Sequence, residues 1–336
     1  MTTISTTLPF FNKPGPMRDF LEERGLRCEW FSKAPAEGKP ELADAIKAVK
    51  EHAAEMEYFF ADTTPLDKEF FAAAKKLKLV AMFGVGLDHI DIQAATERGV
   101  IVTNVPGGNA RCVAEFAVAM MMDLTHKVTQ MHITMTQGQW RPRMCTEISG
   151  KTLGIVGLGH IGRDVARLVK GFGMNVIAAN RTPRPEIAKE LGLTQVPLDE
   201  VLEKADYVSL HIPGGPDSWH FGAKEFAKMK KGAFFINTAR GDLVDLDALY
   251  TALKEDRIAG AGLDVFPQEP MDPSHPIFTL PQVVATPHAG SMSREAMNNL
   301  VTSCLDEFVR AVKKQRSPNA RNSQVYDMPG WEGFAG

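Results

Sequence analysis

The chain has 336 residues, 44% of them hydrophobic and 24% charged, and 38 basic against 41 acidic side chains leave a net charge of −3. This length allows two domains with separate cores, and the balance of charge argues against nucleic-acid or anionic-membrane partners. The first residues lack a basic segment followed by a long apolar one, and no stretch reaches membrane-spanning length, so we expect a cytoplasmic protein. Four scattered cysteines without C-x-x-C spacing predict neither disulfides nor a metal site.

The first hundred residues alternate helical and strand patterns, which predicts a small doubly wound α/β unit. Helices are expected at 17–24, 41–54, 65–74 and 91–97, and strands at 26–31, 57–61, 78–83 and 100–103. The segment Gly84-Val85-Gly86-Leu87-Asp88-His89 follows the third of these strands directly. Two glycines at the carboxyl end of a strand leave backbone N–H groups free to bind an anion.

The pattern changes after residue 104. Residues 110–136 are apolar around much of the helical circumference, with polar interruptions, so we expect one buried helix that links or pairs domains. A second α/β unit is expected over 151–288, and another long helix over 292–314. The tail, 317–336, is expected to be extended and anchored by Trp331 and Phe334. In the second unit we expect strands at 153–156, 176–179, 207–210, 233–237, 259–264 and 283–285, and helices after Gly162 and at 223–229 and 245–255.

A glycine-rich motif opens this second unit. The apolar run at 153–156 is followed by Gly157-Leu158-Gly159-His160-Ile161-Gly162, and apolar side chains then recur at helical spacing. Strand, G-x-G-x-x-G, helix and strand in this order predict a dinucleotide-binding fold; a purely structural turn is the alternative. We expect Gly157 to allow a tight turn, Gly159 to admit a pyrophosphate and Gly162 to let helix and strand pack closely. The pyrophosphate would bind at the helix N-terminus.

The end of the next strand bears on the choice of nicotinamide cofactor. Folds that prefer NAD usually carry Asp or Glu there, which accepts hydrogen bonds from ribose hydroxyls. This chain has Asn180, followed by Arg181, Thr182 and Arg184. No carboxylate repels a 2′-phosphate, and guanidinium and hydroxyl groups are present to bind one. The pattern favours NADPH; a solvated basic turn is the alternative, with NAD possible as the cofactor.

Three polar side chains lie in segments that follow predicted strands of the second unit. The carboxyl ends of the strands form the ligand crevice in this architecture. Arg240 would bind a carboxylate there through bidentate hydrogen bonds. His288 is a candidate acid or base, and Glu269, if close to it, would favour the imidazolium and so a proton donor near neutral pH. Taken singly, each could equally be a solvated loop residue. The other histidines, His89, His160 and His211 among them, have no acidic partner at a suggestive spacing.

Four sequence blocks, in this order, resemble the D-isomer-specific 2-hydroxyacid dehydrogenase family. They are VGLGHIG at 156–162, INTARGDLVD at 236–245, AGLDVFPQEP at 261–270 and TPHAGS at 286–291, and the resemblance covers residues 57–312. It implies an α/β protein of two doubly wound parallel-sheet domains with the active site in the cleft. A Rossmann cofactor domain, 105–289, would be inserted in a flavodoxin-like substrate domain made of 1–104 and 290–336.

The resemblance also implies residue roles. The family's catalytic Arg, Glu and His match Arg240, Glu269 and His288, its cofactor aspartate matches Asp264, and its carboxylate-binding loop matches Val85-Gly86. A 2-keto acid would accept a hydride from NAD(P)H while His288 protonates the developing alkoxide and Glu269 keeps the imidazole protonated and oriented. The expected substrate contacts are Val85, Gly86, Arg240 and His288. The expected cofactor contacts are Gly157, Gly159, His160, Ile161, Gly162, Asn180, Arg181, Thr182, His211, Pro213, Thr238, Ala239, Arg240, Asp264 and His288.

Two departures from the family pattern narrow the function. The loop 214–220, GGPDSWH, replaces the Thr-rich loop of many members, near the adenosine end of the cofactor. Asn180-Arg181-Thr182 resembles the NADPH-using glyoxylate and hydroxypyruvate reductases, which favours a small 2-keto acid. The alternatives are an NAD-linked D-3-phosphoglycerate dehydrogenase, a non-catalytic nucleotide-sensing co-repressor on the same scaffold and, remotely, a methyltransferase. The resemblance and the apolar long helices favour a homodimer through the cofactor domains.

Overall fold

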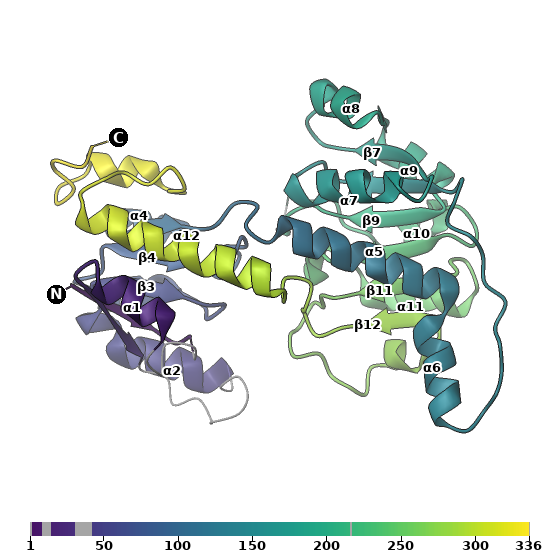
Figure 1. The fold of residues 1–336 in the computed structure, drawn as a ribbon, viewed down its shortest axis with the longest axis horizontal. Coiled ribbons are helices and arrows are strands. Elements are labelled where there is room, and N and C mark those ends of the chain that lie inside the picture. The colour runs from purple at the N-terminus through teal and green to yellow at the C-terminus, as the bar shows by residue number, and fades with distance from the viewer. Residues whose placement is uncertain (1, 9–14, 31–41, 216, 336) are drawn as a thin grey trace. The chain divides into compact units, whose positions relative to one another are not determined.

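The computed structural model of the chain describes residues 2–8, 15–30, 42–215 and 217–335. Phe31, Glu41, Pro216 and Gly336, which belong to segments considered above, lie outside the described residues. The chain divides into two compact units, Met1–Asn109 with Arg294–Gly336, and Ala110–Ser293, each built on one parallel sheet (Figure 1). The second unit thus interrupts the first along the chain. The expected fold class, two doubly wound parallel-sheet α/β domains, is confirmed.

The first unit is a five-stranded sheet with helices on both faces. Its elements are β1 (Thr2–Thr6), α1 (Pro16–Glu22), β2 (Leu26–Trp30), α2 (Leu42–His52), η2 (Ala53–Glu55), β3 (Tyr58–Ala61), α3 (Lys68–Ala73), β4 (Leu79–Met82), α4 (Ile92–Glu97), β5 (Ile101–Thr103), α12 (Arg294–Val312) and η5 (Ser323–Asp327). The strand order is β2-β1-β3-β4-β5, all parallel. Helices α1 and α12 bury Leu21 and Phe308 on one face, and α2 and α3 bury Val49 and Phe71 on the other. Parallel pairing places the loops after β4 and β5 side by side.

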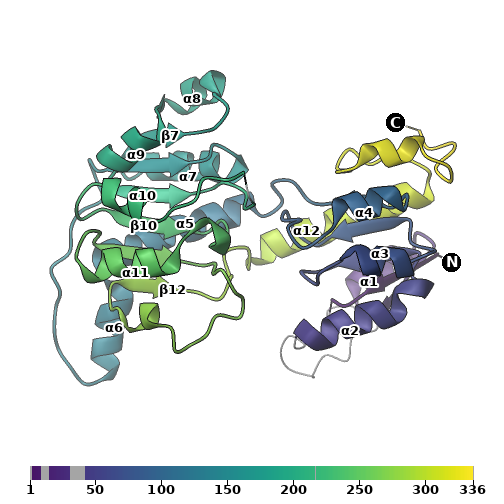
Figure 2. The ribbon, with the colours of Figure 1, turned by 180° about the vertical axis from the view of Figure 1, so that it is seen from behind.

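The second unit is a seven-stranded parallel sheet, again covered on both faces. Its elements are α5 (Ala110–His126), α6 (Val128–Thr136), β6 (Thr152–Val156), α7 (His160–Lys170), β7 (Asn175–Ala179), α8 (Pro185–Leu191), β8 (Thr194–Gln195), α9 (Leu198–Lys204), β9 (Tyr207–Leu210), α10 (Ala223–Lys228), β10 (Phe234–Asn237), η3 (Gly241–Leu243), α11 (Leu246–Lys254), β11 (Gly260–Leu263), η4 (Pro276–Thr279) and β12 (Val283–Ala285). Helices α5 and α7 bury Met121 and Val165 on one face, and α9 and α10 bury Leu202 and Phe226 on the other. Figure 2 shows α9, α10 and α11 on the face turned away in Figure 1.

The strand order of this sheet, β12-β11-β10-β9-β6-β7-β8, reverses between β6 and β9. From β6 the chain proceeds outward through β7 and β8, returns, and proceeds outward in the other direction from β9 to β12. In open parallel sheets the crevice at such a reversal, beyond the carboxyl ends of the strands, is where ligands bind. The glycine-rich loop follows β6 and therefore lies at this point.

The segment 110–136, expected as one buried helix, is two helices, and that expectation is wrong. The chain turns at Lys127, whose φ is +57°. The backbone N–H of Lys127 donates to the carbonyl of Asp123 at 2.6 Å, while the Asp123 carboxylate accepts from the backbone N–H of Thr129 at 2.7 Å. Asp123 thus closes α5 and satisfies a free donor in the first turn of α6. Helix α6 has no buried residue. Among the described residues, no helix is long and apolar enough to cross a membrane.

Among the α-helices and strands of the described residues, four are not predicted by the sequence patterns: β1, α8, β8 and α9. Strand β1 reads TTIST and has little apolar signal, but β-branched threonines favour strands. Thr6 can be buried there because its hydroxyl donates to the carbonyl of Phe60 at 3.0 Å. Strand β8 has only two residues, too few for a periodic signal.

The tail after α12 is not simply extended, because it contains the short helix η5. The expected anchoring is confirmed. Trp331 is 6% exposed, and its ring packs against Phe334 with centroids 4.7 Å apart and against Tyr326 at 5.1 Å.

Candidate active site

The three glycines of the loop after β6 differ in their surroundings. Gly157 has a φ of +103°, and a Cβ there would lie 2.5 Å from the carbonyl oxygen of His211. A Cβ at Gly162 would lie 2.1 Å from the carbonyl oxygen of Gly157, so α7 approaches the loop only because that side chain is absent. Around Gly159 nothing lies within 4 Å of the position of a Cβ. The loop therefore has no room for a side chain at Gly157 or Gly162, whereas the space around Gly159 is open.

Helix α7 begins at this open position. Gly159 is its N-cap residue, no side chain caps it, and the first turn holds no acidic residue. His160 and Ile161 are its first two residues, so their backbone N–H groups are among the donors that an α-helix leaves without partners inside the helix. Together with the helix dipole, these donors favour an anion.

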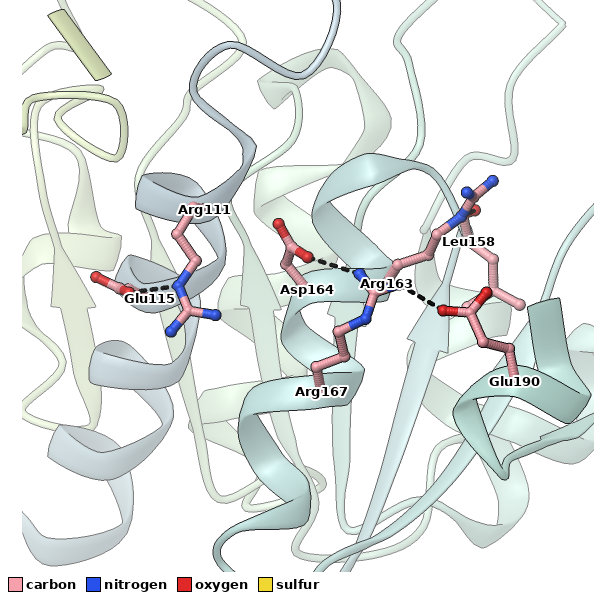
Figure 3. A network of polar contacts seen from close by, with 7 residues as sticks. All are labelled: Arg111, Glu115, Leu158, Arg163, Asp164, Arg167 and Glu190. Atoms are coloured by element: carbon pink, nitrogen blue, oxygen red, sulfur yellow. Dashed lines mark hydrogen bonds and ion pairs between the residues drawn. The ribbon is translucent and has the colours of Figure 1, made fainter. Parts of the chain in front are cut away.

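Charged side chains along α7 are shown in Figure 3. The Nε atom of Arg163 donates to the carbonyl of Leu158 at 3.1 Å and ties the glycine-rich loop to the first turn of the helix. Arg167, one turn further on, pairs with Asp164 at 2.9 Å and with Glu190 at 2.8 Å. Arg163 is a loop-holding residue that the sequence analysis missed. The one sequence feature that could have indicated this role is the position of Arg163 in the first turn of the helix that follows the glycine-rich loop.

Residues after β7 contact both the glycine-rich loop and the loop at 214–220. The Asn180 side chain accepts from the backbone N–H of Leu158 at 3.0 Å and donates to the carbonyl of Thr182 at 2.5 Å. Arg181 is exposed, and its guanidinium donates to the carbonyl of Asp217 at 2.5 Å. Asn180 therefore braces the glycine-rich loop, and Arg181 links two segments that the sequence analysis considered separately.

Two buried polar atoms at neighbouring strand ends have no hydrogen-bond partner within the described chain: Nδ1 of His211 and Oγ1 of Thr238. Leu210 pairs with Asn237 in the sheet, so His211 and Thr238 follow directly on paired positions of β9 and β10. The Nε2 atom of His211 lies 2.9 Å from the hydroxyl of Ser209, and burial lowers the pKa of His211 to about 3. His211 is therefore neutral. Unsatisfied buried polar atoms are uncommon, and two together at a crevice indicate a ligand contact.

The turn that carries Arg240 is held by Asn237, the last residue of β10. The Asn237 amide donates to the carbonyl of Arg240 at 2.8 Å and accepts from the N–H of Ala239 at 3.0 Å. A Cβ at Gly241 would lie 1.9 Å from the carbonyl carbon of Phe266, so this turn packs directly on the backbone that leads to Glu269. Asn237 was not recognised as a site residue from the sequence. Its signal is an amide at a strand end just before a tight turn.

Glu269 and His288 are joined by a hydrogen bond of 2.7 Å between Oε2 and Nδ1. The other carboxylate oxygen, Oε1, accepts from the backbone N–H of Phe266 at 3.0 Å. Burial raises the pKa of Glu269, but these two hydrogen bonds and the charges of His288 and Arg240 outweigh it, so the pKa is lowered. The structure thus brings Arg240, Glu269 and His288 together in one unit.

The loop that carries His288 is organised by the buried carboxylate of Asp264. Its Oδ1 accepts from the hydroxyl of Thr286 at 2.6 Å and from the N–H of Ala289 at 2.7 Å, and its Oδ2 accepts from the N–H of Gly290 at 2.8 Å. His288 has a φ of +51°, a left-handed backbone uncommon for a side chain of this size and often found at functional sites. The three hydrogen bonds to Asp264 offset that cost and fix where the imidazole projects.

Val85 and Gly86 lie in the first unit, in the loop after β4. Gly84, with a φ of +153°, turns the chain, and its carbonyl accepts from the N–H of Val105 at 2.9 Å. The side chain of Asn104 donates to the carbonyl of Val85 at 2.5 Å. The Val85 side chain is exposed. The loop after β4 is therefore held by the residues that follow β5.

In the part of the chain that the structure describes, neither the buried cysteines nor the other metal-ligating side chains form a second reactive centre. Burial raises the pKa of Cys28 to about 12 and also raises the pKa of Cys304, so neither thiol is a nucleophile near neutral pH. Among the described residues, no group of three His, Cys, Asp or Glu side chains could hold a metal ion.

Of the other expected cofactor contacts, Pro213 accepts from the Ser218 hydroxyl at 2.6 Å and Ala239 lies in the turn before Arg240.

Comparisons with known proteins converge on one family. Residues 118–290 match the model of the D-isomer specific 2-hydroxyacid dehydrogenase NAD binding domain. A glyoxylate reductase from Korarchaeum cryptofilum is 42% identical over 279 residues, covering 80% of this chain and 84% of that protein. A D-3-phosphoglycerate dehydrogenase from Archaeoglobus fulgidus is 39% identical over 262 residues, which are 77% of this chain but only 50% of that protein. The crystal structure of a glyoxylate reductase from Paecilomyes thermophila superposes with a TM-score of 0.83 at 29% identity, covering 96% of this chain and 99% of that one.

Proposed function

The chain belongs to the D-isomer-specific 2-hydroxyacid dehydrogenase family, and from this premise we propose that it reduces a small 2-keto acid with NADPH. Members of the family are NAD(P)-dependent oxidoreductases, and this chain is one of them. The proposed substrate is glyoxylate, hydroxypyruvate or a 2-keto acid of similar size, and the proposed product is the 2-hydroxy acid, of D configuration where it is chiral.

The observation that carries the proposal is the hydrogen-bonded pair of Glu269 and His288 beside Arg240. A carboxylate bonded to Nδ1 fixes the ring orientation and leaves Nε2 to exchange a proton with a substrate. The guanidinium of Arg240, near this pair, can bind a carboxylate through bidentate hydrogen bonds. The interconversion of a 2-keto acid and a 2-hydroxy acid requires an acid or base, a carboxylate that orients it, and an arginine that binds the carboxylate of the substrate.

The unit Ala110–Ser293 has the features that a nicotinamide dinucleotide needs, and we assign cofactor binding to it. The open backbone at Gly159 and the uncapped start of α7 fit the pyrophosphate. The unpartnered atoms of His211 and Thr238, at the neighbouring strand ends, fit further polar groups of the cofactor. When bound, the cofactor supplies the hydride that reduces the keto carbon.

The chain's own residues then bind the substrate and move one proton. Arg240 binds the carboxylate of the 2-keto acid. Carboxylate binding is also proposed for the backbone N–H groups of the Val85-Gly86 loop of the first unit, as the family resemblance implies. The imidazolium of His288 donates the proton on Nε2 to the developing alkoxide oxygen, and Glu269 stabilises the imidazolium before the transfer. In the oxidation direction neutral His288 accepts the proton from the hydroxyl group. Asp264 keeps the His288 loop in place throughout.

The preference for NADPH rests on the residues after β7. No carboxylate occupies position 180, and the exposed Arg181 guanidinium lies with Thr182 at the strand end where the adenosine ribose binds in folds of this type. We propose that Arg181 and Thr182 bind the 2′-phosphate. Arg181 already contacts the carbonyl of Asp217, which holds the guanidinium near this strand end.

The product configuration gives a direct test. Hydroxypyruvate would be reduced with NADPH, and the glycerate formed would be separated on a chiral column. D-Glycerate supports the proposal; L-glycerate, or no product with any small 2-keto acid, contradicts it. The similarity to D-3-phosphoglycerate dehydrogenases makes phosphohydroxypyruvate with NADH the second reaction to try. Failure of every substrate with both cofactors would favour a nucleotide-sensing, non-catalytic role.

We also propose that the chain forms a homodimer through its second unit. Helix α6 and the segment after it bury no side chain between Val128 and Glu147, although several are large and apolar. An amphipathic or apolar helix needs a partner surface to be stable, and a second copy supplies one by symmetry. The exposed apolar side chains of this surface, which we call the α6 arm, are Val128, Ile133, Met135, Trp140 and Met144.

A further inference from the structure

The C-terminal segment of the first unit runs along the free edge of β5. The N–H of Arg321 donates to the carbonyl of Val102 at 2.9 Å. The side chain of Asn322 accepts from the N–H of Val102 at 2.9 Å and donates to the carbonyl of Val100 at 2.8 Å. Because β5 is the last strand of its sheet, these bonds satisfy edge groups that would otherwise face solvent. The segment is thereby fixed next to the carboxyl end of the strand.

One side chain of this segment reaches beyond the edge. The Nε atom of Arg321 donates to Oδ1 of Asn104 at 2.6 Å. Asn104 follows β5, is 4% exposed, and donates through Nδ2 to the carbonyl of Val85 at 2.5 Å. A guanidinium can only donate and a carbonyl can only accept, so the Asn104 amide has a single orientation that satisfies both neighbours. Arg321 therefore selects the orientation in which Asn104 donates to Val85.

The orientation of the Val85 carbonyl determines the direction of a second group. The carbonyl of Val85 and the N–H of Gly86 belong to one planar, trans peptide unit and point in opposite directions. When Asn104 holds the carbonyl, the Gly86 N–H is directed away from Asn104. Gly84, which precedes this peptide, is held separately by the N–H of Val105 at 2.9 Å, so the flanking backbone is also fixed.

We propose that Arg321 is a positioning residue for substrate: it orients Asn104, and through Asn104 the Val85-Gly86 peptide whose N–H binds the 2-keto acid carboxylate. This inference rests on the proposed function of the Val85-Gly86 loop. Arg321 does not touch the substrate. The C-terminal segment thus contributes to substrate affinity as well as covering a sheet edge.

The test compares Arg321→Ala with Arg316→Ala, a matched arginine of the same segment. Arg316 pairs with Asp327 at 3.1 Å and donates to the carbonyl of Phe334, so its loss disturbs the packing of the segment without touching Asn104. We expect Arg321→Ala to raise KM for glyoxylate or hydroxypyruvate about tenfold, as for one lost charged hydrogen bond, with kcat and the NADPH KM nearly unchanged. Arg316→Ala should leave all three constants nearly unchanged.

Two further variants keep the test decisive if Arg321→Ala does not fold. Arg321→Lys retains a donor and should recover part of the lost affinity. Asn104→Asp keeps an acceptor for Arg321 but cannot donate to Val85, so it should raise KM even though the segment stays attached. A normal keto-acid KM in folded Arg321→Ala or in Asn104→Asp overturns the inference. An equal rise of KM in Arg316→Ala also overturns it, because general packing of the segment would then explain the effect.

Failure of the proposed function can be told apart from failure of this inference. If the wild-type chain turns over no 2-keto acid, the proposed function fails. The effect of Arg321 on the Val85-Gly86 peptide, through Asn104, is then examined by NMR. The backbone amide signal of Gly86 should then shift and its order parameter fall in Arg321→Ala but not in Arg316→Ala. Identical Gly86 signals in wild type and Arg321→Ala would show that Arg321 does not orient the Val85-Gly86 peptide.

Discussion

The Nδ1 atom of His288 lies 2.7 Å from Oε2 of Glu269, and the second oxygen of that carboxylate is held by the N–H of Phe266. The carboxylate therefore cannot rotate without losing two hydrogen bonds, and the imidazole cannot turn without losing its partner. Asp264 accepts hydrogen bonds from the Thr286 hydroxyl and from the Ala289 N–H, and so holds the chain on both sides of His288. This arrangement leaves one ring nitrogen, Nε2, for proton exchange with a ligand.

The first prediction concerns His288 itself. His288→Ala should lower kcat for 2-keto acid reduction by about 100- to 10,000-fold, the usual contribution of a general acid, because the proposed proton donor is lost. The dissociation constant for NADPH, measured by the quenching or enhancement of its fluorescence, should change little. His52→Ala, on α2 in the other unit, serves as the control and should retain full activity. Preserved turnover in His288→Ala would remove the acid/base assignment.

The second prediction concerns pH. The pKa of Glu269 is below its ordinary value, so the carboxylate that is hydrogen-bonded to Nδ1 of His288 is present above the ordinary carboxyl pKa and is lost as the pH falls through the lowered value. Turnover should therefore fall as the pH falls through the lowered pKa of Glu269, because the protonated carboxyl group no longer holds Nδ1 of His288 as a carboxylate. Glu269→Gln removes the titrating carboxylate, so it should lower turnover and should also abolish this loss on the acidic side. Parallel pH profiles for wild type and Glu269→Gln would contradict this role.

The third prediction concerns the cofactor. Arg181→Ala should weaken NADPH binding by about ten- to a hundredfold, as expected for a lost charge-assisted contact to phosphate, and should weaken NADH binding much less. Arg167→Ala removes a surface arginine of the same unit that is already paired with Asp164 and Glu190. It should affect neither cofactor. Titration of each variant with both nucleotides decides the matter, and equal losses for NADPH and NADH would exclude a 2′-phosphate contact by Arg181.

The fourth prediction concerns assembly. Trp140→Asp together with Met144→Asp places two charges on the α6 arm and should convert a dimer into a monomer in sedimentation-velocity experiments. Phe172→Asp changes an exposed aromatic residue outside the α6 arm and should leave the dimer intact. A wild-type chain that sediments as a monomer at micromolar concentration would refute the proposed dimer.

The sequence predicts most of the second unit because its strands are short apolar runs that end in chemically distinctive residues. The run at 153–156 followed by the glycines is one case, and the strand ending at Asn237 before Arg240 is another. The fold class and the family resemblance follow from such blocks. The glycine spacing also indicated where the backbone must be tight: φ is +103° at Gly157, and a Cβ at Gly162 would collide with the loop.

The features that the sequence patterns missed depend on particular contacts, and two of the three examples involve residues distant in sequence. Strand β1 has a polar sequence, and its place in the sheet is decided by pairing with β2 and β3 and by the bond from Thr6 to Phe60. The break at Lys127 depends on one aspartate that closes α5 and supports α6. Arg321 and Asn104 are 217 residues apart in the chain, so no local pattern relates them. No local sequence pattern identifies the break at Lys127 or the contact between Arg321 and Asn104.

The most direct test of the account is a set of initial rates with NADPH and with NADH on glyoxylate, hydroxypyruvate and phosphohydroxypyruvate. The account predicts the highest kcat/KM with NADPH on glyoxylate or hydroxypyruvate, and a clearly lower value for the same substrate with NADH. Turnover confined to phosphohydroxypyruvate with NADH, or no turnover with any pair, would contradict it.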